Sequence, residues 1–149
     1  MIVVTTPTGH IGSQVVRNLL AANAAVRVTV RDPERIAPEI RSKVEIVQGS
    51  TDDNDILMRA LDGAESLFLI VPPSFTTNDD REHYLQFTRP ACRAIKSRGV
   101  KHVVSVSGVG RHSALKAGPV TASFVKDAEI EGTASISERY GVRASWRTC

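Results

Sequence analysis

The first fifteen residues place the strongest constraint on what this chain can fold into. A short run of β-branched residues, Ile2 to Thr5, meets a turn rich in threonine, proline and glycine, and a helical pattern begins directly after it at about His10. Apolar residues then recur at helical spacing from Ile11 to Leu20. A strand, a glycine turn and a helix in this order place a diphosphate at the positive N-terminal end of the helix. The stretch therefore predicts the first unit of a dinucleotide-binding sheet.

Apolar runs alternate with helical patterns along the rest of the chain. Further strands are predicted at residues 26–30, 44–47, 66–71, 101–106 and 142–146, and helices at residues 10–22, 53–62, 81–97 and 123–139, besides a short helix opening at 32–33 and a loop-like segment at 111–121. Parallel strands joined by single helices require right-handed crossovers. The chain is therefore predicted to be α/β: one Rossmann-type domain over residues 1–149, with a doubly wound parallel sheet of about six strands and helices on both faces.

Several local signals refine this prediction. Asp32, which is followed by a proline, and Asp53 are predicted to cap helices. Pro90 falls inside the helix at 81–97 and should kink or split it, because proline lacks the N–H of a helical hydrogen bond. Residues 66–71 are nearly all apolar, so this strand is predicted to be central and buried on both faces.

Composition excludes several classes of function. The net charge is only +3, and the basic residues are interleaved with acids, so we predict no nucleic-acid-binding face. The two cysteines and four histidines show no metal-ligand spacing. No apolar run reaches the roughly 18 residues of a membrane span, and the N-terminus lacks the basic region of a secretory signal. A cytoplasmic protein without a metal or membrane partner is expected.

Five stretches of the chain match the motifs of one known family. Residues 5–12 resemble a T-G-A-T-G-x-x-G turn, residues 28–33 resemble V-R-x-P, and residues 99–107 resemble G-V-K-x-x-V-x-x-S. Residues 47–49 and 60–68 resemble the third-strand, helix and fourth-strand pattern of the same family. Together these motifs resemble the NmrA-like proteins among the atypical short-chain dehydrogenases, beside the NADPH-dependent quinone or dye reductases.

The resemblance covers roughly residues 1–146 and implies a Rossmann-type domain that binds NADP(H), followed by a smaller substrate domain. The sequence ends at Cys149, where family members usually continue. The lid over a substrate would then be absent, and the chain would be a fragment, a truncated gene product or a protein that works with less. An uncovered sixth strand at the sheet edge would also make a homodimer plausible.

Gly9 and Gly12 are the glycines that the turn retains. Gly9 would let the backbone approach the diphosphate, and Gly12 would let the helix pack close to the strand. The first glycine of the fingerprint is replaced by Thr6 or Pro7, according to the spacing used, and neither tolerates a positive φ well. We therefore expect φ below zero at this point or a displaced phosphate, and weaker binding than in a glycine-bearing relative.

Arg31 and Asp32 compete for one role at the end of the second strand. An acid there would hold the ribose hydroxyls of NAD, whereas an arginine accommodates the 2′-phosphate of NADP. Asp32 already serves as a helix cap, which frees Arg31, with Arg35 one turn further on, to bind a phosphate. NADP(H) is therefore favoured over NAD(H), the alternative being that Arg31 is merely a solvated side chain.

The resemblance implies further contacts to the dinucleotide. Relatives usually carry an aspartate against adenine at the position of Ser50, so Ser50 or Thr51 is expected near that base. The loop after the fourth strand should lie beside the nicotinamide ribose, although a simple strand stop explains its prolines equally well. The predicted cofactor-binding residues are Thr6, Thr8, Gly9, His10, Ile11, Gly12, Arg31, Arg35, Ser50, Val71, Pro72 and Pro73.

Ser107 and Lys126 are the candidate catalytic residues. Short-chain dehydrogenases place a serine at the end of the fifth strand and follow it with Tyr-x-x-x-Lys, in which the tyrosine moves the proton. Here Ala122 stands where the tyrosine would be, and Tyr140 is expected to pack at a helix end. Lys126 would hold the nicotinamide ribose or be a surface lysine, and both alternatives stay open.

Two functions from different classes are consistent with these residues. The first is an NADPH-dependent oxidoreductase acting on a small quinone-like, dye-like or carbonyl substrate. The second is a non-catalytic NADP(H)-binding sensor or regulator, which the missing tyrosine and lid favour. An incomplete remnant that binds no dinucleotide is a third possibility.

Overall fold

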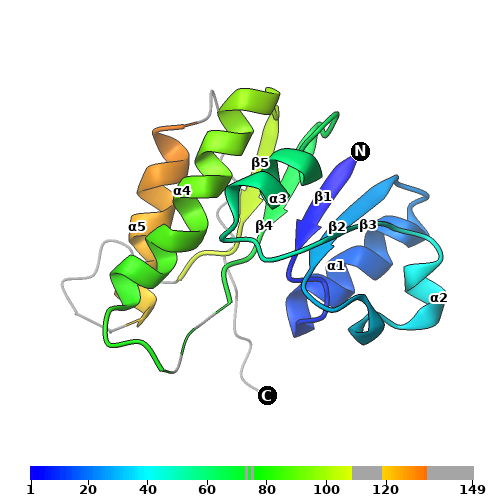
Figure 1. Ribbon diagram of the computed structural model, residues 1–149, viewed down its shortest axis with the longest axis horizontal. Coiled ribbons are helices and arrows are strands. Elements are labelled where there is room, and N and C mark those ends of the chain that lie inside the picture. The colour runs from blue at the N-terminus through cyan, green and yellow to red at the C-terminus, as the bar shows by residue number, and fades with distance from the viewer. Residues whose placement is uncertain (73, 75, 109–118, 134–149) are drawn as a thin grey trace, which may run out of the picture.

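Five parallel strands form one sheet in the order β3-β2-β1-β4-β5. The computed structural model describes residues 1–72, 74, 76–108 and 119–133. The chain builds the sheet outward from β1 in one direction, then crosses back to place β4 on its other side (Figure 1). The strands are β1 (Ile2–Thr5), β2 (Val26–Val30), β3 (Glu45–Gln48), β4 (Ser66–Leu69) and β5 (His102–Ser105). This order confirms the Rossmann-type prediction; the predicted strand at 142–146 lies outside the described residues.

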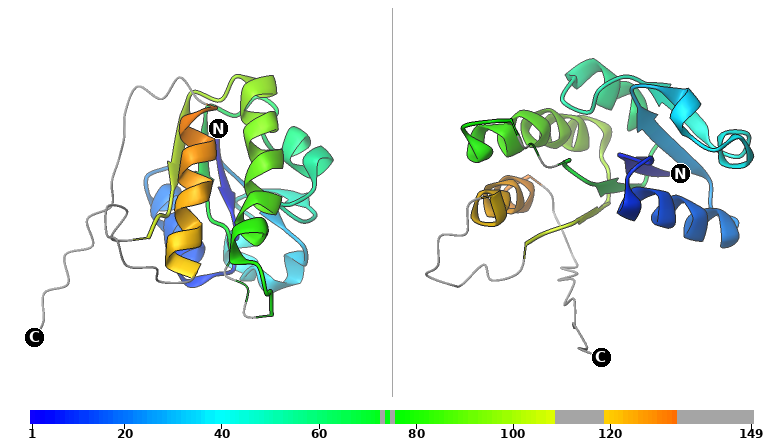
Figure 2. Two further views of the ribbon diagram at one scale, coloured as in Figure 1. Left: turned by 90° about the vertical axis from the view of Figure 1, so that its left-hand side faces the viewer. Right: turned by 90° about the horizontal axis from the view of Figure 1, so that it is seen from below.

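Helices cover both faces of the sheet. They are α1 (His10–Ala21), the 3₁₀ helix η1 (Pro33–Arg35), α2 (Pro38–Arg41), α3 (Asn54–Ala60), α4 (Asp80–Arg98) and α5 (Pro119–Glu131). The first crossovers, through α1 and α2, lie on one face, and α3, α4 and α5 lie on the other, with α4 and α5 side by side (Figure 2).

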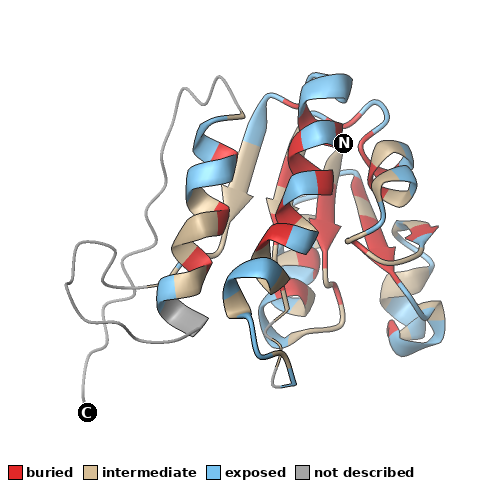
Figure 3. Ribbon diagram, turned by 60° about the vertical axis from the view of Figure 1, so that its left-hand side comes forward, coloured by how far each residue is buried: buried red, intermediate tan, exposed pale blue. Residues whose placement is uncertain are grey.

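The core is split by the sheet into two hydrophobic clusters. Alternate residues of β1 divide between them, because successive strand side chains point to opposite faces. Val3 packs with α3, α4 and Ile130 of α5, while Val4 packs with Val16 of α1 and the valines of β2. Figure 3 shows the buried positions on the strands and on the inward sides of the helices. Burial on both faces is the reason the central strands read as continuous apolar runs.

The predicted helix caps are present. The Asp53 carboxylate accepts hydrogen bonds from the backbone N–H groups of Asp55 and Ile56, at 2.8 and 3.4 Å, and begins α3. The Asp32 carboxylate accepts the Glu34 N–H at 3.1 Å and begins η1. Gly99, with φ of 65°, ends α4 in the left-handed conformation that glycine adopts without steric cost.

Three element predictions differ from the structure. Helix α4 is not split at Pro90, because the residue is buried in a helix whose following turn, Ala91 to Ile95, lies in the core and offsets the lost hydrogen bond. Helix α5 begins at Pro119 rather than residue 123, since proline suits a first turn, and it ends at Glu131 rather than 139. Strand β4 ends at Leu69 rather than residue 71, for a reason given below, and the short helix α2 was not predicted.

Candidate functional site

A cavity of about 430 Å³ lies at the carboxyl ends of the strands. It spans the ends of β1, β2 and β3, next to the point where the strand order reverses between β1 and β4. Open parallel sheets bind their ligands in this crevice. The residues that line it are Thr6, Pro7, Thr8, Thr29, Val30, Arg31, Asp32, Arg35, Gly49, Ser50, Thr51, Pro72 and Phe87.

The turn after β1 has a left-handed residue where the fingerprint has its first glycine. Thr6 has φ of 54°, so the expectation of a turn with φ below zero is wrong. The Thr6 carbonyl accepts the Gly9 N–H at 3.2 Å, and its hydroxyl donates to the Ile70 carbonyl at 3.1 Å. These bonds hold a β-branched residue in a conformation that costs of order 1–3 kcal/mol.

Thr5 and Thr6 also explain why β4 ends early. Thr5 Oγ1 accepts the Ile70 N–H at 2.7 Å and lies 3.1 Å from the Ile70 carbonyl, which Thr6 Oγ1 also contacts. Side chains of the first strand thus satisfy the backbone of Ile70. Main-chain pairing between the two strands is not needed at Ile70, and the segments that follow β1 and β4 separate at the crevice.

Glycine is required at position 12 and optional for the fold at position 9. A Cβ on Gly12 would lie 2.1 Å from the Thr6 carbonyl oxygen, so only glycine lets α1 pack this closely. A Cβ on Gly9 would meet nothing nearer than 3.5 Å, and Gly9 has an ordinary φ of −80°. Gly9 offers no side chain to cap α1, whose first turn carries no acid. The first N–H groups of this helix are therefore available to an anionic ligand.

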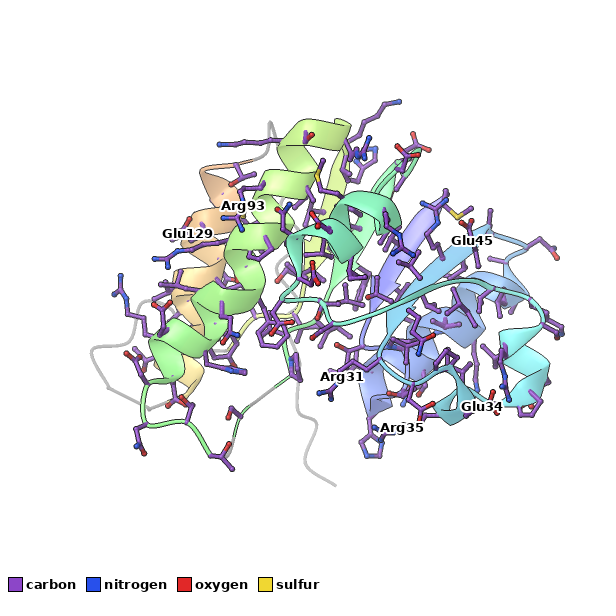
Figure 4. The ribbon with its side chains drawn as sticks, in the orientation of Figure 1. Arg31, Glu34, Arg35, Glu45, Arg93 and Glu129 are labelled. Carbon is purple, nitrogen blue, oxygen red and sulfur yellow. The ribbon has the colours of Figure 1, made fainter. Side chains whose placement is uncertain are left out.

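Arg31 and Arg35 lie at the end of β2, on the wall of the cavity beside this helix terminus. Figure 4 shows both at the lower edge of the molecule, where the strands end. Both are exposed, and neither forms an ion pair with another described residue. Glu34, between them in sequence, instead pairs with Arg41. Two arginines without an ion-pair partner among the described residues thus line a cavity that adjoins a helix N-terminus.

Beyond the arginines, the cavity continues to the loop after β3. Gly49 has φ of 153°, and a Cβ there would lie 2.4 Å from the Ile56 side chain, so the turn requires glycine. Ser50 and Thr51 follow it on the cavity wall. Thr29 and Phe87 line the same end and were not predicted. Thr29 carries a buried hydroxyl without a hydrogen-bond partner in the described part of the chain.

The loop after β4 forms the inner wall of the cavity. Pro72 lines it, and Val71 is buried beside Pro72, while Pro73 lies outside the described residues. His83 of α4 donates from Nε2 to the Pro72 carbonyl at 2.7 Å, and its ring lies 5.1 Å from the ring of Phe87. His83 was not predicted, because only the fold brings α4 against this loop.

Ser107 follows β5, and Lys126 lies on α5 with its ammonium at the last residue of that strand; neither residue lines the cavity. Lys126 is 1% exposed, so the alternative of a surface lysine is wrong. Its ammonium donates to Ser105 Oγ and, at 2.5 Å, to Asp127 Oδ1; Ser107 Oγ donates to Asp127 Oδ2. Asp127 was not predicted as a member of this cluster, although an acid directly after the lysine is a usable signal. Tyr140 lies outside the described residues.

Most of the predicted cofactor-binding residues fall into two groups. Thr6, Thr8, Arg31, Arg35, Ser50 and Pro72 line the cavity. Gly9, His10, Ile11 and Gly12 form the adjoining start of α1, where His10 and Ile11 are exposed. The described residues hold no group of three or more potential metal ligands, and none of their helices is long and apolar enough to span a membrane.

The family model of the NmrA-like family matches residues 1–142. A (4-alkanoyl-5-oxo-2,5-dihydrofuran-3-yl)methyl phosphate reductase of Streptomyces griseus is 35% identical over 72% of this chain and 34% of its own length. An NAD(P)H azoreductase of Xenophilus azovorans is 33% identical over 74% and 36%. The fold matches Citrobacter sp. triphenylmethane reductase complexed with NADP(H), with a TM-score of 0.76 and 23% identity over 89% of this chain and 46% of that one.

The chain thus spans about a third of the length of these two curated relatives, 34% and 36%. The matched region runs from the glycine turn through β5 and α5, and so includes the whole of the cavity described above. With a family model matching nearly its full length, the chain belongs to the NmrA-like family.

Proposed function

We propose that the cavity binds NADP(H), with its diphosphate at the N-terminus of α1. The single observation that carries this proposal is an uncapped helix N-terminus adjoining a cavity lined by Arg31 and Arg35, which have no ion-pair partner in the described part of the chain. The helix terminus suits the diphosphate, and the guanidinium groups suit the 2′-phosphate that distinguishes NADP(H) from NAD(H).

The residues present fit such a group. The fold itself accepts a side chain at Gly9, so the bare backbone there is explained by a ligand that approaches closely. The orphaned hydroxyl of Thr29 lies in the same wall, and a buried hydroxyl without a partner costs free energy. Both features favour a polar ligand in this cavity.

We further propose that the protein is an NADPH-dependent oxidoreductase for a small quinone-like, dye-like or carbonyl substrate. When bound, the reduced nicotinamide supplies a hydride. This chain's own part is to orient the substrate, for which Ser107 is the exposed hydroxyl of the cluster with Asp127 and Lys126, while water supplies the proton at the reduced atom. The names of the relatives, an azoreductase and a reductase of a carbonyl-bearing phosphate, support this class.

NADPH binding is tested by fluorescence titration of wild type, Arg31→Ala and Arg59→Ala. Arg59 is the matched control, because it is an exposed arginine on α3 away from the cavity. Loss of one exposed phosphate contact, worth roughly 1 kcal/mol, should weaken NADPH binding in Arg31→Ala about fivefold, with little effect on NADH. Wild-type protein that binds neither dinucleotide overturns the proposal.

A non-catalytic sensor is the second candidate, and one observation favours it. Ser105, Ser107, Lys126 and Asp127 are bonded to one another, and none of them lines the cavity. Consumption of NADPH in the presence of quinones and azo or triphenylmethane dyes separates the two candidates. Tight binding without turnover over that panel supports the sensor, and turnover that Ser107→Ala abolishes supports the enzyme.

A further inference from the structure

The part of the cavity lining that consists of Gly49, Ser50, Thr51 and Phe87, here called the base slot, is where a base would lie, an assignment that rests on the proposed function. With the phosphates at α1 and the 2′-phosphate at Arg31, the base attached to that same ribose must lie within a few ångströms of the end of β2. The Gly49–Thr51 loop lies directly beside that strand end, since the Gly49 N–H donates to the Val30 carbonyl at 3.0 Å, and both this loop and Phe87 line the cavity. The base would therefore have the Phe87 ring on one side and the hydroxyls of Ser50 and Thr51 at its edge.

Apart from Asp32, no acid among the described residues lines the cavity, although three aspartates follow Thr51 closely in sequence. Asp52 Oδ2 accepts a hydrogen bond from the Gln86 side chain at 3.2 Å, and Asp52 does not line the cavity. Asp53 caps α3, and its Oδ1 accepts the N–H of Asp55 at 2.8 Å. These acids are directed to α3 and α4, and the groups left at the edge of the slot are neutral.

Asp32 is the one acid among the described residues that line the cavity. Its Oδ1 accepts the Glu34 N–H at 3.1 Å, which holds the carboxylate at the start of η1. The carboxylate is therefore engaged by the backbone at the start of η1. Recognition of the base is left to hydroxyls and to an aromatic face.

A serine hydroxyl and a carboxylate differ in which groups they can bind at position 6 of a purine. Adenine presents an amino donor at position 6, whereas hypoxanthine presents an oxo acceptor there. A carboxylate can only accept, so it binds the amino group and repels the oxo group, while a serine hydroxyl accepts from one and donates to the other. An aromatic ring stacks on either base, because both have a π-face.

We propose that this protein does not discriminate between 6-amino and 6-oxo purine dinucleotides, and that it binds the hypoxanthine analogue of NADPH within tenfold of NADPH itself. Ser50 is the residue that relaxes the selectivity, and Phe87 supplies stacking that both bases share. The site then selects its ligand through phosphates, ribose and nicotinamide rather than through the base.

The test compares dissociation constants of NADPH and reduced nicotinamide hypoxanthine dinucleotide phosphate by fluorescence titration of the full chain. A ratio below ten supports the proposal. A larger ratio, with NADPH still bound, overturns it and shows that main-chain groups of the loop read the base edge. Absence of binding by either dinucleotide instead defeats the proposed function, so the two failures are distinguishable.

Variants locate the cause of the ratio. Ser50→Asp introduces a charged acceptor and should raise the ratio at least tenfold, since hydrogen bonds to charged groups are roughly 1.5–3 kcal/mol, equivalent to about 10- to 150-fold. Asp52→Asn is the matched control, which changes a neighbouring carboxylate directed away from the slot and should leave the ratio unaltered. A Ser50→Asp ratio equal to that of wild type refutes the assignment of Ser50.

Phe87 provides an independent check on the slot. Phe87→Ala should weaken both dinucleotides by the same factor, about five- to 150-fold for the loss of one stacking contact, while the control Phe87→Leu keeps apolar volume and loses less. Unequal losses for the two bases, or no loss for either, would show that the base does not lie against this ring. Thermal denaturation of each variant verifies that it is folded.

Discussion

Substitution of the two glycines of the turn by alanine should separate the fold from the ligand. A Cβ at Gly12 would be placed 2.1 Å from the Thr6 carbonyl oxygen and 2.9 Å from its carbon, both backbone atoms. An ordinary contact needs about 3.4 Å, so α1 or the turn must move by roughly 1 Å. At Gly9 the nearest atoms are 3.5 and 3.6 Å away, and no movement is needed.

The magnitudes follow from these distances. Overpacking of this kind costs typically 1–3 kcal/mol, which in a chain of this size is about 2–4 °C in Tm for each kcal/mol. Gly12→Ala should therefore lower Tm by roughly 2–12 °C. In Gly9→Ala the entropy lost by the unfolded chain stabilises by about 0.4–1 kcal/mol, which the poorer N-cap propensity of alanine offsets. The free energy of unfolding should stay within about 1 kcal/mol of wild type.

For Gly9→Ala we expect a loss of NADPH affinity without a loss of stability, whereas Gly12→Ala should lose stability. Gly9→Ala places a methyl group where the diphosphate approaches the backbone, so NADPH affinity should fall at least tenfold in a protein of unaltered Tm. Chemical denaturation and NADPH titration of the two variants and wild type provide both readouts. Gly9→Ala protein with wild-type affinity would refute the placement of the diphosphate, and Gly12→Ala protein with wild-type Tm would refute the close packing of α1 on the turn.

Three further predictions use other parts of the site. Thr6 already has the left-handed backbone that glycine would supply, so the reason to expect weaker binding than in a glycine-bearing relative no longer holds. Thr6→Gly should therefore leave the NADPH dissociation constant within threefold of wild type in a fluorescence titration, and a larger gain in affinity would contradict this. Lys126→Met removes the ammonium that pairs with the Asp127 carboxylate and, among the described contacts, leaves it only the Ser107 hydroxyl, so the variant should lose about 3–5 kcal/mol of unfolding free energy in chemical denaturation. Lys101→Ala, which breaks an exposed pair, should cost under about 1 kcal/mol, and equal losses in the two variants would refute the stabilising role of the buried pair. Burial, together with the charges of Asp80 and Asp127, raises the pKa of Tyr84 above its ordinary value near 10. The neutral phenol therefore contributes stability that is fully present below pH 10 and is lost as the pH rises further. Tyr84→Phe should reduce this alkaline loss in a pH series of melting temperatures.

Local chemistry made much of the fold predictable. Asp53 and Gly99 act through neighbours within a few residues, so a cap and a stop could be predicted from the chain alone. The predicted split at Pro90 was wrong because continuity of the helix depends on burial against the core, which outweighs the lost hydrogen bond. Thr6 was misjudged because its left-handed backbone is held by Ile70, sixty-four residues away.

The candidate site was predictable where a motif carries it and obscure where packing does. Arg31 and Ser50 sit at strand ends that periodicity locates, and both line the cavity. Phe87 and His83 lie on α4, which reaches the cavity only through the packing of that helix over the sheet. An aromatic residue in an amphipathic helix carries no signal that separates a binding wall from an ordinary core position.

The threonine hydroxyls between β1 and Ile70 have a consequence for how a ligand enters. In an open sheet the crevice forms where the strand order reverses and the segments that follow two neighbouring strands separate. The floor of the crevice could widen if these segments separated further. Here the hydroxyls of Thr5 and Thr6 hold the two segments together through three contacts of 2.7–3.1 Å to the Ile70 backbone. The floor therefore has a fixed width, and any adjustment to an incoming molecule falls on the outer walls, where the exposed arginines lie.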